Sequence, residues 1–143
     1  MDKEIHIGKK INILSHSIHR KIAREASQYG LTGVQARILG FLYRESNKRS
    51  IFQKDIEEEL DTRRSSVTSV LQLMEKNGYI DRVSVCEDAR LKKIILTDRG
   101  TEIQEKVYDY ILGFEKSLRD ELSDEELDIL SKLIDRLTRK IAE

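Results

Sequence analysis

The sequence predicts a mainly α-helical chain, in which six helices are accompanied by one small β-hairpin. Apolar residues recur every three or four positions along most of the 143 residues, which is the spacing of one helix face. The chain contains no proline, so nothing interrupts long helices. The exception is the stretch at 79–97, where two runs of β-forming residues flank a polar tip. A chain of this length can bury a substantial core.

The first two helices are predicted by their apolar spacing and by the residues at their ends. From residue 4 to residue 29 apolar side chains keep a near-heptad spacing, and Gly30 provides the left-handed residue at which such a helix ends. Thr32 and Gln35 have the spacing of a capping box, which predicts a second helix that runs to about Ser46.

Two further helices are predicted close together in the middle of the chain. A short amphipathic segment occupies 53–60, and the next helix begins at Thr62 or Arg63 and ends at Asn77 and Gly78. The apolar stripe of this fourth helix consists of Val67, Val70, Leu71 and Met74.

The opposite face of the fourth helix carries hydroxyls, an amide and guanidiniums, and no carboxylate. Its residues are Arg63, Arg64, Ser65, Ser66, Thr68, Ser69 and Gln72. Hydroxyls and guanidiniums bond phosphates and base edges, whereas the DNA backbone repels carboxylates. We therefore expect this face to enter a major groove, with Ser65, Ser66 and Thr68 best placed for phosphates and base edges. The alternative is an ordinary solvated helix face, which is the commoner reason for such a composition.

The hairpin is expected to be basic near its tip. Its strands are predicted at 79–86 and 93–97, with the polar tip at 87–92 between them. The order helix, short turn, helix and basic hairpin is that of a winged helix-turn-helix, whose wing reaches a minor groove. We therefore expect Arg90 to enter a minor groove, and Lys92 and Lys93 to contact phosphates.

The last two helices extend the apolar pattern beyond this region. Thr97 caps a helix with a stripe from 103 to 118, and a capping box at Ser123 opens a final helix with a stripe from 127 to 141. With the first helix, they carry more apolar surface than a compact winged helix can cover. We expect a homodimer through the N- and C-terminal helices, which would read an inverted-repeat site. The alternative is an elongated monomer that folds these helices back on itself.

Composition narrows the remaining possibilities. Basic and acidic residues number 26 each, so we do not expect a protein that coats nucleic acid without sequence preference. A locally basic surface would still permit DNA binding. The single cysteine, Cys86, fits a reducing cytosol and predicts a packed strand thiol rather than a sensor. No apolar run is long enough to span a bilayer, and the N-terminal residues lack the apolar stretch of a signal peptide, so we expect a cytoplasmic protein without membrane contact.

No catalytic constellation or phosphate-binding glycine loop is found, so the chain is not expected to be an enzyme, and no cofactor is expected. His16 and His19, three residues apart, and the preceding His6 do not complete a metal site, because further ligands are not indicated.

The chain resembles the MarR family of bacterial transcription regulators along essentially its whole length. The resemblance is most specific in Gln-Lys-Asp-Ile at 53–56, Arg-Arg-Ser-Ser-Val-Thr at 63–68, Leu-Met-Glu-Lys-Asn-Gly-Tyr-Ile at 73–80, Asp-Ala-Arg-Leu-Lys-Lys at 88–93 and Leu-Thr-Asp-Arg-Gly at 96–100. Two positions depart from the family pattern: Phe52 stands where a capping threonine is common, and Leu73, where a charged residue is frequent, would pack under the wing or face a partner.

The resemblance implies the same dimer, and a small phenolic or lipophilic effector bound between the dimer and DNA-binding regions. The candidate effector contacts are Tyr29, Phe41, Tyr108 and Phe114, although helical aromatics are more often core residues. The chain is expected to be one domain, 1–143, in which 1–30 and 101–143 dimerise and 31–100 bind DNA. Its expected role is a repressor that binds a palindromic operator and is released by the effector. The alternative is a winged-helix scaffold module without specific DNA binding.

Overall fold

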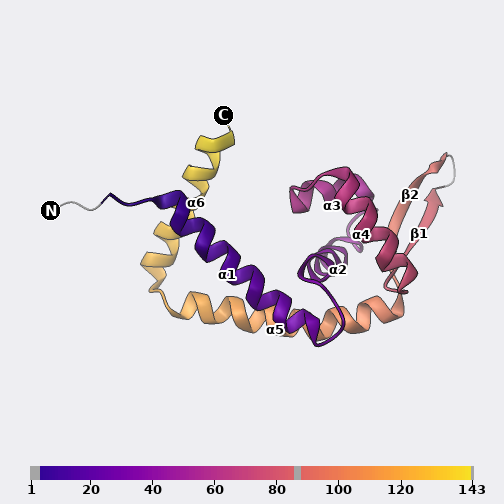
Figure 1. The fold of residues 1–143 in the computed structure, drawn as a ribbon, viewed down its shortest axis with the longest axis horizontal. Coiled ribbons are helices and arrows are strands. Elements are labelled where there is room, and N and C mark those ends of the chain that lie inside the picture. The colour runs from indigo at the N-terminus through magenta and orange to yellow at the C-terminus, as the bar shows by residue number, and fades with distance from the viewer. Residues whose placement is uncertain (1–3, 86–87, 143) are drawn as a thin grey trace. The chain divides into compact units, whose positions relative to one another are not determined.

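The computed structural model describes residues 4–85 and 88–142 (Figure 1). The chain folds into two compact units, Met1–Tyr108 and Asp109–Glu143. Cys86, the predicted strand thiol, lies outside the described residues. No helix in the described part of the chain combines the length and the apolar character needed to cross a bilayer.

The predicted fold class is confirmed, because the described residues form six helices and one two-stranded antiparallel sheet. The elements are α1 (Ile7–Ser27), α2 (Gly33–Glu45), α3 (Gln53–Leu60), α4 (Arg64–Lys76), β1 (Ile80–Val85), β2 (Asp88–Leu96), α5 (Asp98–Asp120) and α6 (Asp124–Ala142).

The core of the first unit is built by α2, α3, α4 and the hairpin. Its most deeply buried apolar side chains are Ile38, Leu39 and Leu42 of α2, Ile56 of α3, Val67, Leu71 and Met74 of α4, and Ile80 and Ile94 of the strands. The predicted stripe of α4 therefore faces the core, apart from Val70, which is half-buried. Burial of this stripe fixes which side of α4 remains in contact with solvent.

The predicted helix ends are confirmed by their hydrogen bonds. Thr32 and Gln35 form a reciprocal capping box at the start of α2. Gly30 and Gly78 adopt φ values of 75° and 82°, a conformation that glycine reaches without the steric cost of a Cβ. The hydroxyl of Thr97 accepts a bond from the Gly100 amide at 3.0 Å. These local signals explain why the sequence alone located most helices.

The side chain of Phe52 has no oxygen with which to cap α3, and the Asp55 side chain supplies the other half of a capping box. The carboxylate of Asp55 accepts the backbone N–H of Phe52 at 2.8 Å, and it also pairs with Arg49 at 3.1 Å. This is the half of a capping box in which the third helical residue reaches back to the N-cap amide.

The prediction was wrong about where the second wing strand begins. Strand β2 starts at Asp88 rather than at Lys93, so Arg90 and Lys92 lie in a strand and not in a loop. Lys92 pairs with Ser84, and the register shifts between Ser84 and Val85. Backbone pairing extends the hairpin here regardless of side-chain polarity, since a solvated antiparallel ribbon tolerates polar residues.

The wing is also joined to the chain that precedes α3. The amide of Ile94 donates to the carbonyl of Ile51 at 2.7 Å, and Phe52 forms an isolated antiparallel bridge with Lys93. The start of α3 is therefore held by the same strand that forms the wing.

An ion pair connects α4 to the base of the wing. A guanidinium nitrogen of Arg82 on β1 lies 3.0 Å from a carboxylate oxygen of Glu75 on α4. The hydrogen bond from Arg82, which favours the charged carboxylate, lowers the pKa of Glu75 below its usual 4.5. A lowered native pKa means that the pair stabilises the fold above pH 4.5 and loses this contribution as the pH falls through the native pKa.

We predict that Glu75→Gln destabilises the protein at pH 7, and that the difference from wild type becomes smaller in acid. The loss should be below about 1 kcal/mol, because the pair is partly exposed and screened by solvent. Urea unfolding at pH 7 and pH 3 measures both values. Glu102→Gln is the control, since Glu102 is exposed and its carboxylate oxygen lies 4.0 Å from the amine nitrogen of Lys106, a longer distance than in the pair of Glu75 and Arg82. Equal differences between Glu75→Gln and wild type at both pH values would contradict the prediction.

Candidate nucleic-acid interface

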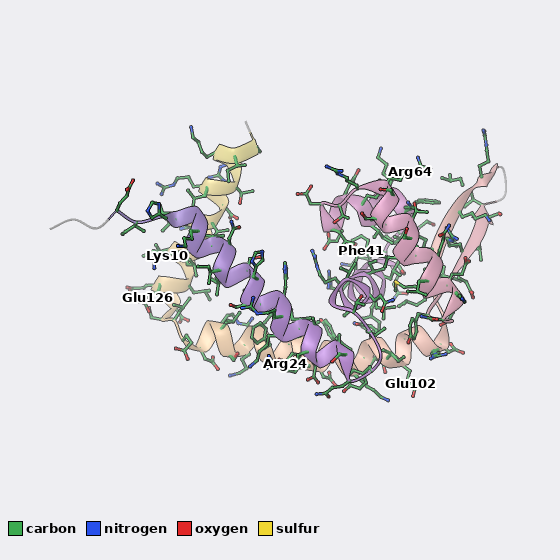
Figure 2. The ribbon with its side chains drawn as sticks, in the orientation of Figure 1. Lys10, Arg24, Phe41, Arg64, Glu102 and Glu126 are labelled. Atoms are coloured by element: carbon green, nitrogen blue, oxygen red, sulfur yellow. The ribbon has the colours of Figure 1, made fainter. Side chains whose placement is uncertain are left out.

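The outer face of α4 is the first part of the candidate site. Six of the seven side chains predicted for this face are exposed, and Thr68 is half-buried. Arg63 is the N-cap residue of α4, and Arg64 lies on the side of α3 and α4 that is away from the first turns of α5 (Figure 2). As far as Gln72, this face carries no carboxylate.

The seven residues are not equivalent in position. Helical geometry places Ser65, Ser69 and Gln72 opposite the buried residues of α4. Ser66 lies to one side, where it lines a recess of about 110 Å³ with Val34 of α2. The other flank, toward α3, is occupied by Thr68.

The hydroxyl of Thr68 is already engaged within the protein. It donates to the carbonyl of Arg64 at 2.8 Å and accepts from the side-chain amide of Gln53 at 2.7 Å. The same amide nitrogen lies 3.4 Å from the Arg64 carbonyl oxygen. This network connects the first residue of α3 to the first turns of α4, and sequence periodicity could not reveal it, because the partners are 15 residues apart.

Leu73 lies on the exposed side of α4, with 48% of its surface accessible. It does not pack under the wing, so that part of the prediction was wrong. Its helical position, toward Ser66 and away from Thr68, explains why the hairpin does not cover it.

A groove of about 540 Å³ separates α3 and α4 from the wing. The residues that line it are Phe52, Gln53, Lys54, Glu57, Arg64, Thr68, Arg82, Arg90, Leu91, Lys92 and Ile94. Five of them are cationic and one, Glu57, is acidic. The groove therefore favours an anionic ligand, and it joins the exposed face of α4 to the wing.

Sequence reasoning predicted Arg64, Arg90 and Lys92 in this region but missed Lys54 and Arg82. Lys54 lies on α3 and Arg82 on β1, and the sequence-based prediction considered only the polar face of α4 and the tip of the hairpin. Lys93, predicted to contact phosphate, does not line the groove; its side chain is half-buried and its backbone pairs with Phe52.

The four candidate effector contacts differ in burial and in their neighbours. Phe41 is 5% exposed and lies under the guanidinium of Arg49, and Tyr108 is half-buried beside Tyr43. Tyr29 is also half-buried in the first unit, whereas Phe114 belongs to the second unit, where it stacks on Tyr110.

A recess of about 270 Å³ does lie between α1 and α2, but other residues line it. These are His19, Ile22, Ala23, Thr32, Gly33, Val34 and Arg37. Apolar periodicity could not identify it, because its walls are the ordinary contact residues of two packed helices. No group of three or more metal-ligating side chains occurs among the described residues.

Comparison with known proteins finds transcription regulators that resemble this chain. The MarR family profile matches residues 29–91, which span α2, α3, α4 and most of the hairpin. The HTH-type transcriptional regulator YwoH of Bacillus subtilis is 27% identical over 128 residues, covering 90% of each chain. PecS of Dickeya dadantii, also an HTH-type transcriptional regulator, is 27% identical over 124 residues, covering 87% of this chain and 75% of PecS.

Solved structures show the same fold over nearly the whole chain. The MepR–DNA complex from S. aureus has a TM-score of 0.89 at 25% identity, and the match covers 96% of this chain and 99% of MepR. The transcription regulator MarR from Oenococcus oeni PSU-1 has a TM-score of 0.79 at 26% identity, covering 93% and 98%. YwoH, PecS and MarR are named as transcription regulators and not as enzymes, in agreement with the sequence-based prediction. The winged helix-turn-helix elements, the match of 29–91 to the MarR family profile and the relatives matched over most of the chain agree, and the chain is similar to transcription regulators of the MarR family.

Proposed function

We propose that this chain is a sequence-specific DNA-binding transcription regulator that represses by occupying a palindromic operator as a homodimer. The observation that carries the proposal is the exposed, carboxylate-free face of α4 beside a groove with five cations and one acid. The likeness to MepR, which was solved in complex with DNA, supports it.

Local charge explains how a neutral chain would bind a polyanion. The chain has 26 basic and 26 acidic residues. The groove nevertheless gathers Lys54, Arg64, Arg82, Arg90 and Lys92 on elements that a duplex could reach together. Cations that neutralise phosphates release condensed counterions, so binding should weaken steeply with salt.

Each predicted contact has a place in this proposal. Arg63, Arg64, Ser65, Ser66, Thr68, Ser69 and Gln72 face the major groove, Arg90 enters the minor groove, and Lys92 and Lys93 contact phosphates. Lys93 is half-buried, so we expect it to contribute less than the exposed Lys92. Residues 31–100 form the DNA-binding region in this arrangement.

The homodimer would be formed by residues 1–30 and 101–143. Within α6 no residue is buried, and Leu130, Leu133, Ile134 and Leu137 are each between 37% and 49% exposed. On α1, Ile7, Ile11 and Leu14 are each about half exposed. Leaving these apolar faces in water costs about 25 cal/mol for each Å², which a second copy of the chain would recover. Two-fold symmetry would then place two α4 helices about one DNA turn apart.

Release by a small phenolic or lipophilic effector completes the proposal. Tyr29 and Tyr108 are half-buried and could contact such a molecule directly. Phe41 is in the core, so a ligand would reach it only if the surrounding side chains moved. Phe114 is partly exposed in the second unit and would add a further aromatic contact.

Selection of bound duplexes from fragmented genomic DNA tests the function. We expect one enriched inverted repeat, bound by a dimer, with a logarithmic salt dependence that corresponds to several phosphate contacts. Recovery of weak, sequence-independent binding, with and without added phenolic compounds, would contradict the proposal and favour a winged-helix scaffold module.

We predict that Arg90→Ala weakens binding to the selected operator by about 10- to 100-fold, because a cation is removed from the wing. Fluorescence anisotropy at fixed salt measures the change. Lys116→Ala is the matched control, since Lys116 is an exposed cation of the second unit that pairs with Asp120. Wild-type affinity in Arg90→Ala would remove the wing from the interface.

We also predict that Ile134→Asp raises the dimer dissociation constant by roughly 100-fold or more, because a dimer would bury two unpartnered carboxylates. Sedimentation equilibrium measures it. Arg136→Asp introduces the same side chain two residues on, about 200° around the helix, and should leave the dimer intact. An unchanged dimer in Ile134→Asp would show that this face of α6 is not the interface.

A further inference from the structure

Thr68 lines the groove beside α4, yet its hydroxyl proton is committed within the protein. The hydroxyl oxygen of Thr68 lies 2.8 Å from the carbonyl oxygen of Arg64, which can only accept a hydrogen bond, so the hydroxyl of Thr68 supplies the proton. The amide of Gln53, 2.7 Å away, then occupies one of the two lone pairs of the hydroxyl oxygen. Thr68 therefore cannot donate to a ligand without breaking its bond to the Arg64 carbonyl.

This commitment excludes most of the contacts that a threonine hydroxyl makes with DNA. Phosphate oxygens, the N7 and O6 atoms of guanine and the O4 atom of thymine are all acceptors, and they require a donor. The remaining substituent on the β-carbon of Thr68 is a methyl group. The apolar group that a major groove displays is the C5-methyl of thymine, and threonine methyl groups pack against it.

We propose that Thr68 is a specificity-determining residue, which reads a thymine through contact between the two methyl groups, and that Gln53 is its positioning residue. The proposal rests on the proposed function, in which α4 enters a major groove. It differs from the sequence-based expectation, which assigned the hydroxyl of Thr68 to phosphates and base edges.

Gln53 is well placed to hold Thr68 in a single rotamer. It is the first residue of α3, immediately after Phe52, whose backbone is fixed by the Asp55 carboxylate and by the bridge to Lys93. Its amide contacts both the Thr68 hydroxyl and the carbonyl to which that hydroxyl donates. The side chain of Thr68 is thereby held to the backbone of α4 and, through the side chain of Gln53, to α3.

Two substitutions separate the methyl group from the hydroxyl. Thr68→Val keeps a methyl group, loses the hydroxyl and retains one strongly preferred rotamer in a helix. Thr68→Ser keeps the hydroxyl and loses the methyl group. Wild type and both variants are carried through the same selection from randomised duplexes, and the base preference is compared position by position.

We expect the wild type and Thr68→Val to prefer a thymine at one position in each half-site, and Thr68→Ser to lose that preference alone. Replacing this thymine by deoxyuridine removes only its methyl group. The substitution should weaken binding by the wild type and Thr68→Val by about 4-fold for each half-site, which is the factor in affinity that burial of one methyl group contributes. It should not change the affinity of Thr68→Ser.

Gln53→Ala tests the positioning role by the same readout. We expect Gln53→Ala alone to weaken the preference for that thymine, because the side chain of Thr68 is then no longer held in one rotamer. In a Thr68→Val background it should change that preference no further, since valine makes no hydrogen bond to Gln53. A general loss of affinity with an unchanged base preference would mean that Gln53 only stabilises α3 and α4, which would overturn its assigned role.

The outcomes distinguish the inference from the function on which it rests. If wild type enriches no motif, the proposed function fails. If wild type enriches a motif but Thr68→Ser keeps the complete preference, or Thr68→Val loses it, then the methyl group does not read the base and the inference is overturned.

Discussion

Burial of the apolar face of α4 is the constraint on which the candidate site depends. Val67, Leu71 and Met74 are at most 1% exposed, and each contributes about 1.5–3 kcal/mol by leaving water. A helix is rigid, so fixing one face against the core also fixes the direction of the opposite face. Ser65 and Ser69 are displayed to solvent for this reason, and not because of any contact of their own. The same burial sets the distance between α4 and the strands that carry the basic groove residues.

The segment that begins α3 is a structural junction between the wing and α4. Ile51 accepts a backbone bond from Ile94 of the wing, while Gln53, two residues later, bonds Thr68 of α4. The pair formed by Glu75 and Arg82 joins α4 to the wing a second time. The proposed contact with two grooves at once requires a fixed spacing between the contacting elements, and these shared anchors would maintain that spacing. They also commit polar groups that would otherwise be available to DNA.

Charge and apolar surface are segregated along this chain. Cations line the groove of the first unit, whereas acidic residues are concentrated at the start of α6. Asp124, Glu125 and Glu126 lie in the first turn of α6, where their negative charges interact favourably with the positive end of the helix dipole. The rest of α6 exposes an apolar face in each single chain. A neutral total is therefore compatible with a local site for a polyanion and a separate surface for association.

The sequence by itself determined the features that depend on neighbouring residues. The capping box of Thr32 and Gln35, the glycine helix ends and the apolar stripes are local, so six helices and a hairpin could be predicted with most of their boundaries. Tertiary structure decided what depends on distant partners. Strand pairing extends β2 to Asp88, and the fold brings Lys54 and Arg82 into one groove. The hydroxyl of Thr68 donates its proton to a hydrogen bond with the Arg64 carbonyl. The physical reason is that hydrogen bonds and charge clusters form between residues far apart in the chain, and periodicity carries no information about such pairs.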